Sequence, residues 1–245
     1  MQALDSGWPR LWFLAGYALL FALLQGAATL LGSERGEAGL IVAALTIAVA
    51  LVVQRGSFAT SWRAAWLSLG LGAPRARGML AALAACGVLM LAYPLYMLAT
   101  GAGVSVYDGA PLLALGVFAQ GGLAEELVFR GYLYGHLRRR FAFWRAAWLS
   151  LAPFALAHLY LFLTMDWPVA LAALLLSMLL TFPFAWLYEL GGRTIWAAAL
   201  AHAVVQGAIK LLVVGDPVFP LVWMAACVLA LWLVFFVSSS ADSRS

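Results

Sequence analysis

A small set of polar side chains lies inside long apolar stretches of this chain, at spacings that suit chemistry. The sequence EELVFR begins at Glu125, FALAH ends at His158, and HAVVQ begins at His202. Ionisable groups within a membrane are costly and by default mark functional or pairing sites. The candidates are Glu125, Glu126, Arg130, His158, His202 and Gln206.

The first motif combines a carboxylate with a nearby base. Glu126 and Arg130 are four residues apart and share a helix face, so the two charges can neutralise each other. Glu125 points about 100° away on a helix, and its neighbours at i+3 and i+4, Val128 and Phe129, cannot compensate its charge. Desolvation makes such a carboxylate readier to accept a proton, which suits a general base. We therefore expect a structural Glu126 and a reactive Glu125; alternatively, both glutamates only hold helices together.

The two histidines supply groups for proton transfer and hydrogen bonding. His158 follows Phe154 by four residues, and His202 precedes Gln206 by four, so each pair shares a helix face. A carboxylate and an imidazole can hold and deprotonate a water, while a second imidazole and an amide can donate to a developing oxyanion. These are the parts of an amide hydrolase that uses an activated water. The alternative for each histidine is a hydrogen bond between helices.

The composition of the chain places these groups in a membrane. The 245 residues are 66% hydrophobic and 10% charged, whereas soluble domains are roughly 45–50% apolar and about 25% charged. The mean hydropathy of +0.99 shows that the apolar excess extends along the whole chain. This excludes a water-soluble enzyme, a disordered protein and a nucleic-acid binder, which needs a charged face.

Eight continuous apolar runs predict an all-α bundle of transmembrane helices, since about 20 apolar residues cross a bilayer core. Strands of a membrane barrel would alternate instead. We expect a single domain over 1–245 with its motif core at about 110–214. The stretch 55–77, which mixes Trp and Arg, is typical of an interfacial segment. The runs are 10–31, 38–54, 78–100, 110–135, 142–163, 167–188, 194–214 and 217–237.

The basic residues predict the orientation, because cytoplasmic loops are enriched in Lys and Arg. Eleven of the 14 basic residues fall on one side if both termini are cytoplasmic, whereas only Arg35 lies in a connection on the other side. We therefore expect a multi-pass protein of the cell membrane. His136, beside this basic cluster, is expected to be a surface group at the interface. The eleven are Arg10, Arg55, Arg63, Arg75, Arg77, Arg138, Arg139, Arg140, Arg145, Arg193 and Arg244.

The three motifs resemble those of a known family. EELVFR is similar to EExxxR, FALAH to FxxxH, and HAVVQ to HxxxN of the CPBP family (CAAX protease and bacteriocin-processing) of intramembrane proteases. The resemblance covers about 80 residues, from Glu125 to Gln206. Three motifs in order, each in a separate predicted span, are far more specific than EExxxR alone.

The resemblance implies a glutamic-type intramembrane endopeptidase that cleaves a membrane-anchored protein or peptide. It implies that Glu125 and His158 activate water and that His202 and Gln206 form the oxyanion hole. Supporting roles fall to Glu126, Arg130 and Phe154. No cofactor is expected from this mechanism, and neither is a nucleic-acid partner.

One residue departs from the family pattern. Gln206 stands where the family has Asn, and its amide sits on one more methylene, about an ångström further out. A misplacement of that size can cost on the order of 10²-fold in rate. Either the helix is shifted to compensate, or Gln206 contributes little.

Other mechanisms and functions remain open on the sequence. Glu125, His158 and His202 could ligate zinc, although no histidine is followed by Glu as in HExxH. Asp108 and Asp216 superficially resemble the aspartates of intramembrane aspartyl proteases but fall in predicted turns, and no serine lies in a GxSG context. The other open functions are a proton-coupled carrier and a non-catalytic membrane protein that binds a peptide, as in bacteriocin immunity.

Overall fold

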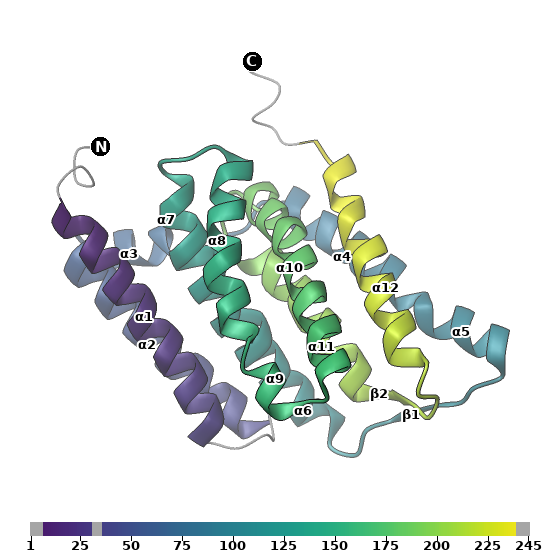
Figure 1. The fold of residues 1–245 in the computed structure, drawn as a ribbon. Coiled ribbons are helices and arrows are strands. Elements are labelled where there is room, and N and C mark those ends of the chain that lie inside the picture. The colour runs from purple at the N-terminus through teal and green to yellow at the C-terminus, as the bar shows by residue number, and fades with distance from the viewer. Residues whose placement is uncertain (1–6, 31–35, 239–245) are drawn as a thin grey trace.

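The apolar runs of the sequence form long helices that pack into one bundle with similar directions (Figure 1). The computed structural model describes residues 7–30 and 36–238. The first half comprises α1 (Gly7–Leu30), α2 (Glu37–Ser57), α3 (Trp62–Ser68), α4 (Ala76–Met90), α5 (Ala92–Thr100), β1 (Val104–Val106), α6 (Ala110–Val117), η1 (Phe118–Ala124) and η2 (Leu127–Tyr134). The second half comprises α7 (Gly135–Arg138), α8 (Phe143–His158), α9 (Leu161–Thr164), α10 (Trp167–Leu190), α11 (Trp196–Leu211), β2 (Leu212–Val214), α12 (Phe219–Trp232) and η3 (Leu233–Phe236).

Six helical stretches within the described residues are long and apolar enough to cross a membrane. The multi-pass helical prediction is thus confirmed, but the predicted count of eight spans is not. Of the two other runs, the first lies in α1 (Gly7–Leu30), within which Leu11–Ala27 is an apolar stretch of the described residues, and the second forms the shorter apolar helix Trp196–Leu211. The six are Glu37–Ser57, Ala76–Thr100, Ala110–Arg138, Phe143–Thr164, Trp167–Leu190 and Phe219–Phe236.

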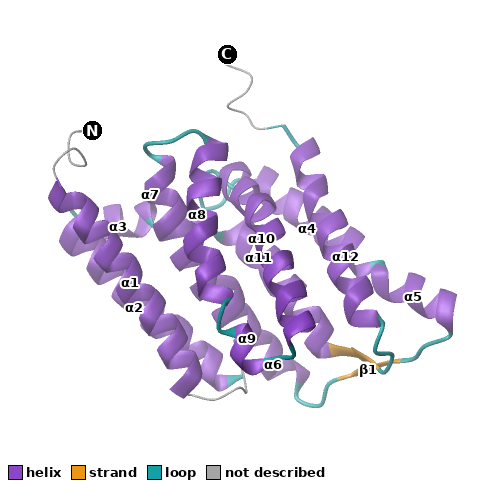
Figure 2. Cartoon of the chain, viewed as in Figure 1, coloured by secondary structure: helices purple, strands orange, loops and turns teal. Residues whose placement is uncertain are grey.

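Helix α11 is shorter than predicted because its expected last residues belong to a strand. Leu212–Val214 pairs antiparallel with Val104–Val106, with Val104 opposite Val214, as the orange strands of Figure 2 show. The all-α prediction is therefore wrong at this one place. Valine, common in both segments, favours strands because β-branched side chains pack well on a pleated surface.

The basic segments gather at one end of the bundle. Figure 1 shows α3 and α7 at the same end as the start of α1 and the end of α12, with β1, β2 and α9 at the other. Contacts join the segments at this end: Arg138 Nε lies 2.9 Å from Glu189 Oε1, and Arg139 donates to the carbonyl of Ser68. The clustering expected from the loop arginines is thus present, while Arg35 and Arg244 lie outside the described residues.

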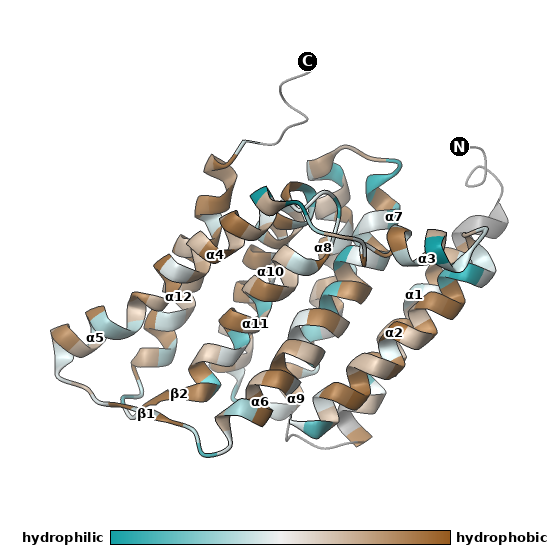
Figure 3. Cartoon of the chain, turned by 180° about the vertical axis from the view of Figure 1, so that it is seen from behind, coloured by the Kyte–Doolittle hydropathy of each residue, from teal (hydrophilic) through white to brown (hydrophobic). Residues whose placement is uncertain are grey.

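The outer faces of the bundle are apolar along most of their length (Figure 3). Large hydrophobic side chains are exposed on helix after helix, among them Leu45, Leu98, Leu156 and Leu229. Exposed apolar surface on this scale is far more than a soluble monomer presents. It fits a protein whose sides are surrounded by lipid.

The segment that carries EELVFR is the inner element of the bundle. Its backbone widens into π-helix over Phe118–Ala124 and again over Leu127–Tyr134, and every residue of the second stretch is buried. Gly122 permits a close approach to α11, because a Cβ there would lie 2.8 Å from the carbonyl oxygen of Ala199. π-Helical turns are rare and occur mostly at functional sites.

One residue at the end of this segment differs from its prediction. His136 was expected to be a surface group, but it is only 5% exposed. Its ring lies among the rings of Phe13, Phe58 and Tyr132, and its Nδ1 lies 2.7 Å from the Tyr132 carbonyl oxygen. The prediction failed because His136 follows directly on the buried face of η2, before the exposed arginines begin.

Candidate active site

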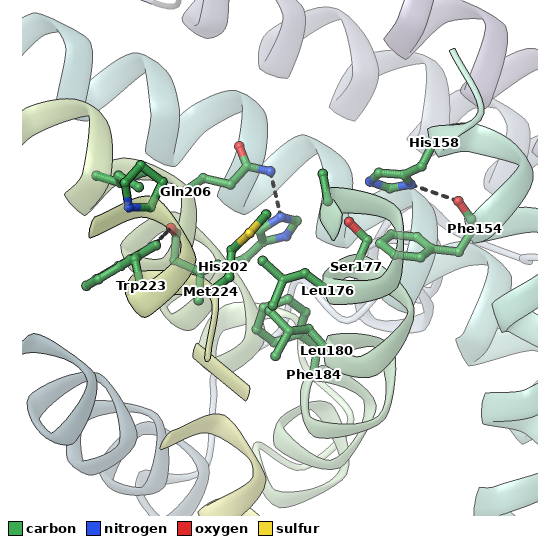
Figure 4. A pocket seen from close by; sticks show the side chains of 14 residues that line it. Phe154, His158, Leu176, Ser177, Leu180, Phe184, His202, Gln206, Trp223 and Met224 are labelled. Atoms are coloured by element: carbon green, nitrogen blue, oxygen red, sulfur yellow. Dashed lines mark hydrogen bonds between the residues drawn. The ribbon is translucent and has the colours of Figure 1, made fainter. Parts of the chain in front are cut away.

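Three neighbouring elements bring the predicted site residues together. Glu125 and Glu126 lie between η1 and η2, and Arg130 lies on η2. Histidine 158 ends α8, and both His202 and Gln206 lie on α11. Figure 4 shows the side chains of His158, His202 and Gln206 around one pocket.

The predicted ion pair of the first motif is present. Arg130 Nη1 donates to Glu126 Oε1 at 2.9 Å, and both side chains are almost fully buried, at 2% and 0% exposure. The guanidinium carbon lies over the rings of Phe154 and Phe184, at 5.0 and 5.1 Å from their centroids. Such stacking stabilises a cation that is removed from water. The Phe of FALAH thus contacts the Arg of EELVFR.

The same carboxylate also holds a histidine from a distant part of the chain. His202 Nδ1 lies 2.7 Å from Glu126 Oε1, and since a carboxylate accepts, Nδ1 carries the proton. The ring of Phe184 stacks on the imidazole at 5.0 Å. Glu126 therefore fixes the orientation of His202. Sequence reasoning missed Phe184 because one aromatic residue in an apolar span gives no signal.

Glu125 and Glu126 occupy different environments. The Glu125 side chain is 15% exposed, whereas that of Glu126 is fully buried. Glu125 Oε2 lies 3.7 Å from His202 Nε2. Glu125 therefore faces the imidazole of α11, which compensates its charge only when His202 is protonated.

One ring nitrogen of His158, Nδ1, is hydrogen-bonded to the backbone. Its Nδ1 donates to the backbone carbonyl of Phe154 at 2.9 Å, as Figure 4 shows. In the neutral ring the lone pair is then on Nε2, the form that accepts a proton. The imidazole is within electrostatic reach of Glu125 and His202.

Gln206 lies against His202, as their spacing predicted, but in an unexpected role. Its Nε2 lies 2.8 Å from His202 Nε2. Because Nδ1 of His202 carries the ring proton, Nε2 of the neutral ring accepts and the amide of Gln206 donates. The carboxamide is thus directed at the imidazole in this arrangement, and not at an open site.

Of the candidate site residues, Phe154, His158, His202 and Gln206 line a cavity of about 200 Å³. Its polar wall is formed by His158, His202, Gln206 and a residue that the sequence did not single out, Ser177. The remainder of the lining is apolar and includes Leu176, Leu180, Val205, Ile209, Trp223 and Met224. The cavity can therefore hold an apolar side chain next to the imidazoles.

The structure also bears on two alternative mechanisms, a metal site and a pair of catalytic aspartates. No group of three or more His, Cys, Asp or Glu side chains that could hold a metal ion is found in the described part of the chain. Asp216 lies in a turn and accepts a hydrogen bond from the Val218 N–H at 2.9 Å. Hydrogen bonds from Tyr96 and from Val218 hold the pKa of this carboxyl below its ordinary value. Asp216 is a turn residue, as expected.

A comparison with protein families matches one segment of the chain. Residues 108–208, somewhat under half of the chain, match the family described as type II CAAX prenyl endopeptidase Rce1-like. Every candidate site residue lies within this segment. No curated protein matches the chain. The similarity of residues 108–208 to the Rce1-like family agrees with the CPBP family that the three motifs resemble.

Proposed function

We propose that the protein is an intramembrane endopeptidase that cleaves a membrane-associated protein or peptide with a water activated by Glu125 and His158. The observation that carries the proposal is the buried network in which Glu126 binds both Arg130 and His202, directly beside Glu125. We further propose a single domain in the cell membrane, with both termini in the cytoplasm and with no cofactor.

The attacking water would lie between a carboxylate and an imidazole. Glu125 is the more accessible of the two glutamates, and the neutral ring of His158 has its lone pair on Nε2. One of these groups takes a proton from the water as its oxygen bonds to the carbonyl carbon. The same proton then passes to the leaving amine as the C–N bond breaks, which is the usual reversal of base and acid.

The negative oxygen of the intermediate would be stabilised by His202 and Gln206. With His202 neutral, Glu125, Glu126 and Arg130 leave the cluster with one net negative charge. A proton taken up from solvent on His202 Nε2 before the substrate binds would make the cluster neutral, since carboxylates lie at 2.7 and 3.7 Å from the ring nitrogens. Nε2 then becomes a donor and releases the amide of Gln206, so both N–H groups can point at one oxygen.

The substrate would place an apolar side chain in the cavity. The lining on α12 is apolar, and α10 and α11 add further apolar side chains beside their polar residues Ser177, His202 and Gln206. Burial of apolar surface there contributes binding energy at about 25 cal/mol per Å². A membrane-embedded peptide segment has the side chains that fit such a cavity.

The proposal is tested by comparing membrane peptides from cells that carry the wild type or Glu125→Gln. Glu37→Gln is the matched control, because Glu37 is exposed in the first turn of α2. We expect a precursor that stays uncleaved in Glu125→Gln alone and that the purified wild type cleaves in liposomes. A wild type that binds the peptide without cleaving it would indicate an immunity protein. Accumulation of the peptide inside sealed vesicles would indicate a carrier.

A further inference from the structure

We infer that Gly121 is a positioning residue, whose missing side chain leaves the space that Gln206 needs beside His202. The inference rests on the proposed function and deepens it, because it explains how the longer side chain takes the place of the family's Asn. Gly121 lies on η1, and Gln206 lies on the helix α11 that packs against it.

The two residues are in direct contact. A Cβ on Gly121 would lie 2.7 Å from Gln206 Oε1 and 3.2 Å from its Cδ. The first of these distances is shorter than atoms tolerate, so a side chain at position 121 requires a movement. The carboxamide therefore lies between His202 Nε2 on one side and the Cα of Gly121 on the other.

The backbones of η1 and α11 cannot easily separate at this contact. At the next residue, Gly122, a Cβ would be 2.8 Å from the Ala199 carbonyl oxygen, so η1 and α11 are already packed backbone to backbone. Both Gly121 and Gly122 are buried. The group that must give way is then the carboxamide of Gln206, which would lose its place at His202.

The length of the side chain at position 206 gives a specific prediction. Asn at position 206 would end one methylene earlier and withdraw the amide from Gly121. A methyl group at position 121 should then be tolerated. The effects of Gly121→Ala and Gln206→Asn are therefore expected to be coupled, as those of residues in contact usually are.

The experiment measures wild type, Gly121→Ala, Gln206→Asn and the double variant on one reconstituted peptide. Gly87→Ala is the matched control, because Gly87 is a helical glycine with nothing within 4 Å of its Cβ position. We expect Gly121→Ala to lower kcat on the order of 10- to 100-fold, with KM changed less than about twofold, whereas Gly87→Ala leaves both unchanged. In the Gln206→Asn background, the same change should cost less than about threefold in kcat.

The thermal unfolding midpoint of each variant supplies a readout that does not depend on activity. The unfolding midpoint of Gly121→Ala should be lower than that of Gly87→Ala when residue 206 is Gln. The two midpoints should be close when residue 206 is Asn. If no variant cleaves any peptide but this coupling is present, the proposed function fails and the contact stands. Equal effects of Gly121→Ala in both backgrounds, in kcat and in the midpoint, would overturn the inference. If Gly121→Ala fails to fold, recovery of the fold in the double variant supports it, and failure of both overturns it.

Discussion

The carboxylate of Glu126 and the imidazole of His202, 76 residues apart in the sequence, meet at 2.7 Å inside the bundle. The same oxygen of Glu126 accepts a hydrogen bond from Arg130. One buried carboxylate thus joins η2 to α11 and orients a histidine. The second carboxylate, Glu125, is left on the more accessible side.

Arg130→Ala should lower the stability of the protein, whereas Glu125→Gln should not. Without Arg130, Glu126 loses a charged partner in a site with no access to water. Removing one partner of a buried pair costs about 3–5 kcal/mol in soluble interiors. The check is the yield and thermal unfolding midpoint of the purified variants. Equal midpoints for wild type, Arg130→Ala and Glu125→Gln would contradict this division between a structural and a reactive carboxylate.

Phe184→Leu should lower the rate more than it lowers stability. The ring of Phe184 lies on both His202 and Arg130, so a smaller side chain lets the imidazole shift. The matched control is Phe182→Leu, since Phe182 is buried on the same helix but packs against Trp148 and Trp232. We expect similar losses in unfolding midpoint, but a fall in kcat on the order of tenfold only for Phe184→Leu. Equal rates for the two variants would show that the stacking does not position His202.

The topology is tested by labelling cysteines placed at opposite ends of the bundle. Asp108 and Arg139 are exposed, and we expect Asp108→Cys and Arg139→Cys to react from opposite sides of the membrane. The native Cys86 and Cys227 are buried and serve as the unlabelled background. If both new cysteines react from the same side, the orientation and the number of spans are wrong.

The parts of the site that the sequence predicted are those that depend on one helix. The Glu126–Arg130 pair and the contact of His202 with Gln206 both follow from a spacing of four residues. The apolar spans follow in the same way from continuous runs. In each case the partners are neighbours on one element, so no knowledge of packing is needed.

The features that the sequence did not predict depend on packing between elements. The contact of Glu126 with His202 requires η1, which ends just before the two glutamates, to pack against α11, and no local pattern encodes it. The shortening of α11 depends on β1, more than 100 residues earlier in the chain. The widened turns around Glu125 arise within a segment buried on all sides, whereas the spacing argument assumed a regular α-helix.

A matched series of inhibitors and variants separates an activated water from a metal or covalent route. If Glu125 and His158 hold the water, no residue is acylated and no metal is required. Cleavage should then survive chelators and serine- or cysteine-directed reagents, and should be lost in Glu125→Gln and His158→Ala. The measurement is a matched series on one reconstituted peptide, with the metal content of each sample determined alongside. Stoichiometric zinc whose removal abolishes cleavage would overturn the mechanism.

Within that series, the loss of kcat should be larger for His202→Ala than for Gln206→Ala. His202→Ala removes a donor that acts chiefly in the transition state, so kcat should fall on the order of 10²–10³-fold with substrate binding largely intact. It also leaves Glu126 with one hydrogen bond fewer, so the unfolding midpoint should fall as well. Gln206→Ala should cost less, because its amide donates to His202 before any oxyanion exists. A loss in Gln206→Ala as deep as that of Glu125→Gln would mean that the carboxamide, and not the imidazole, is the principal oxyanion donor.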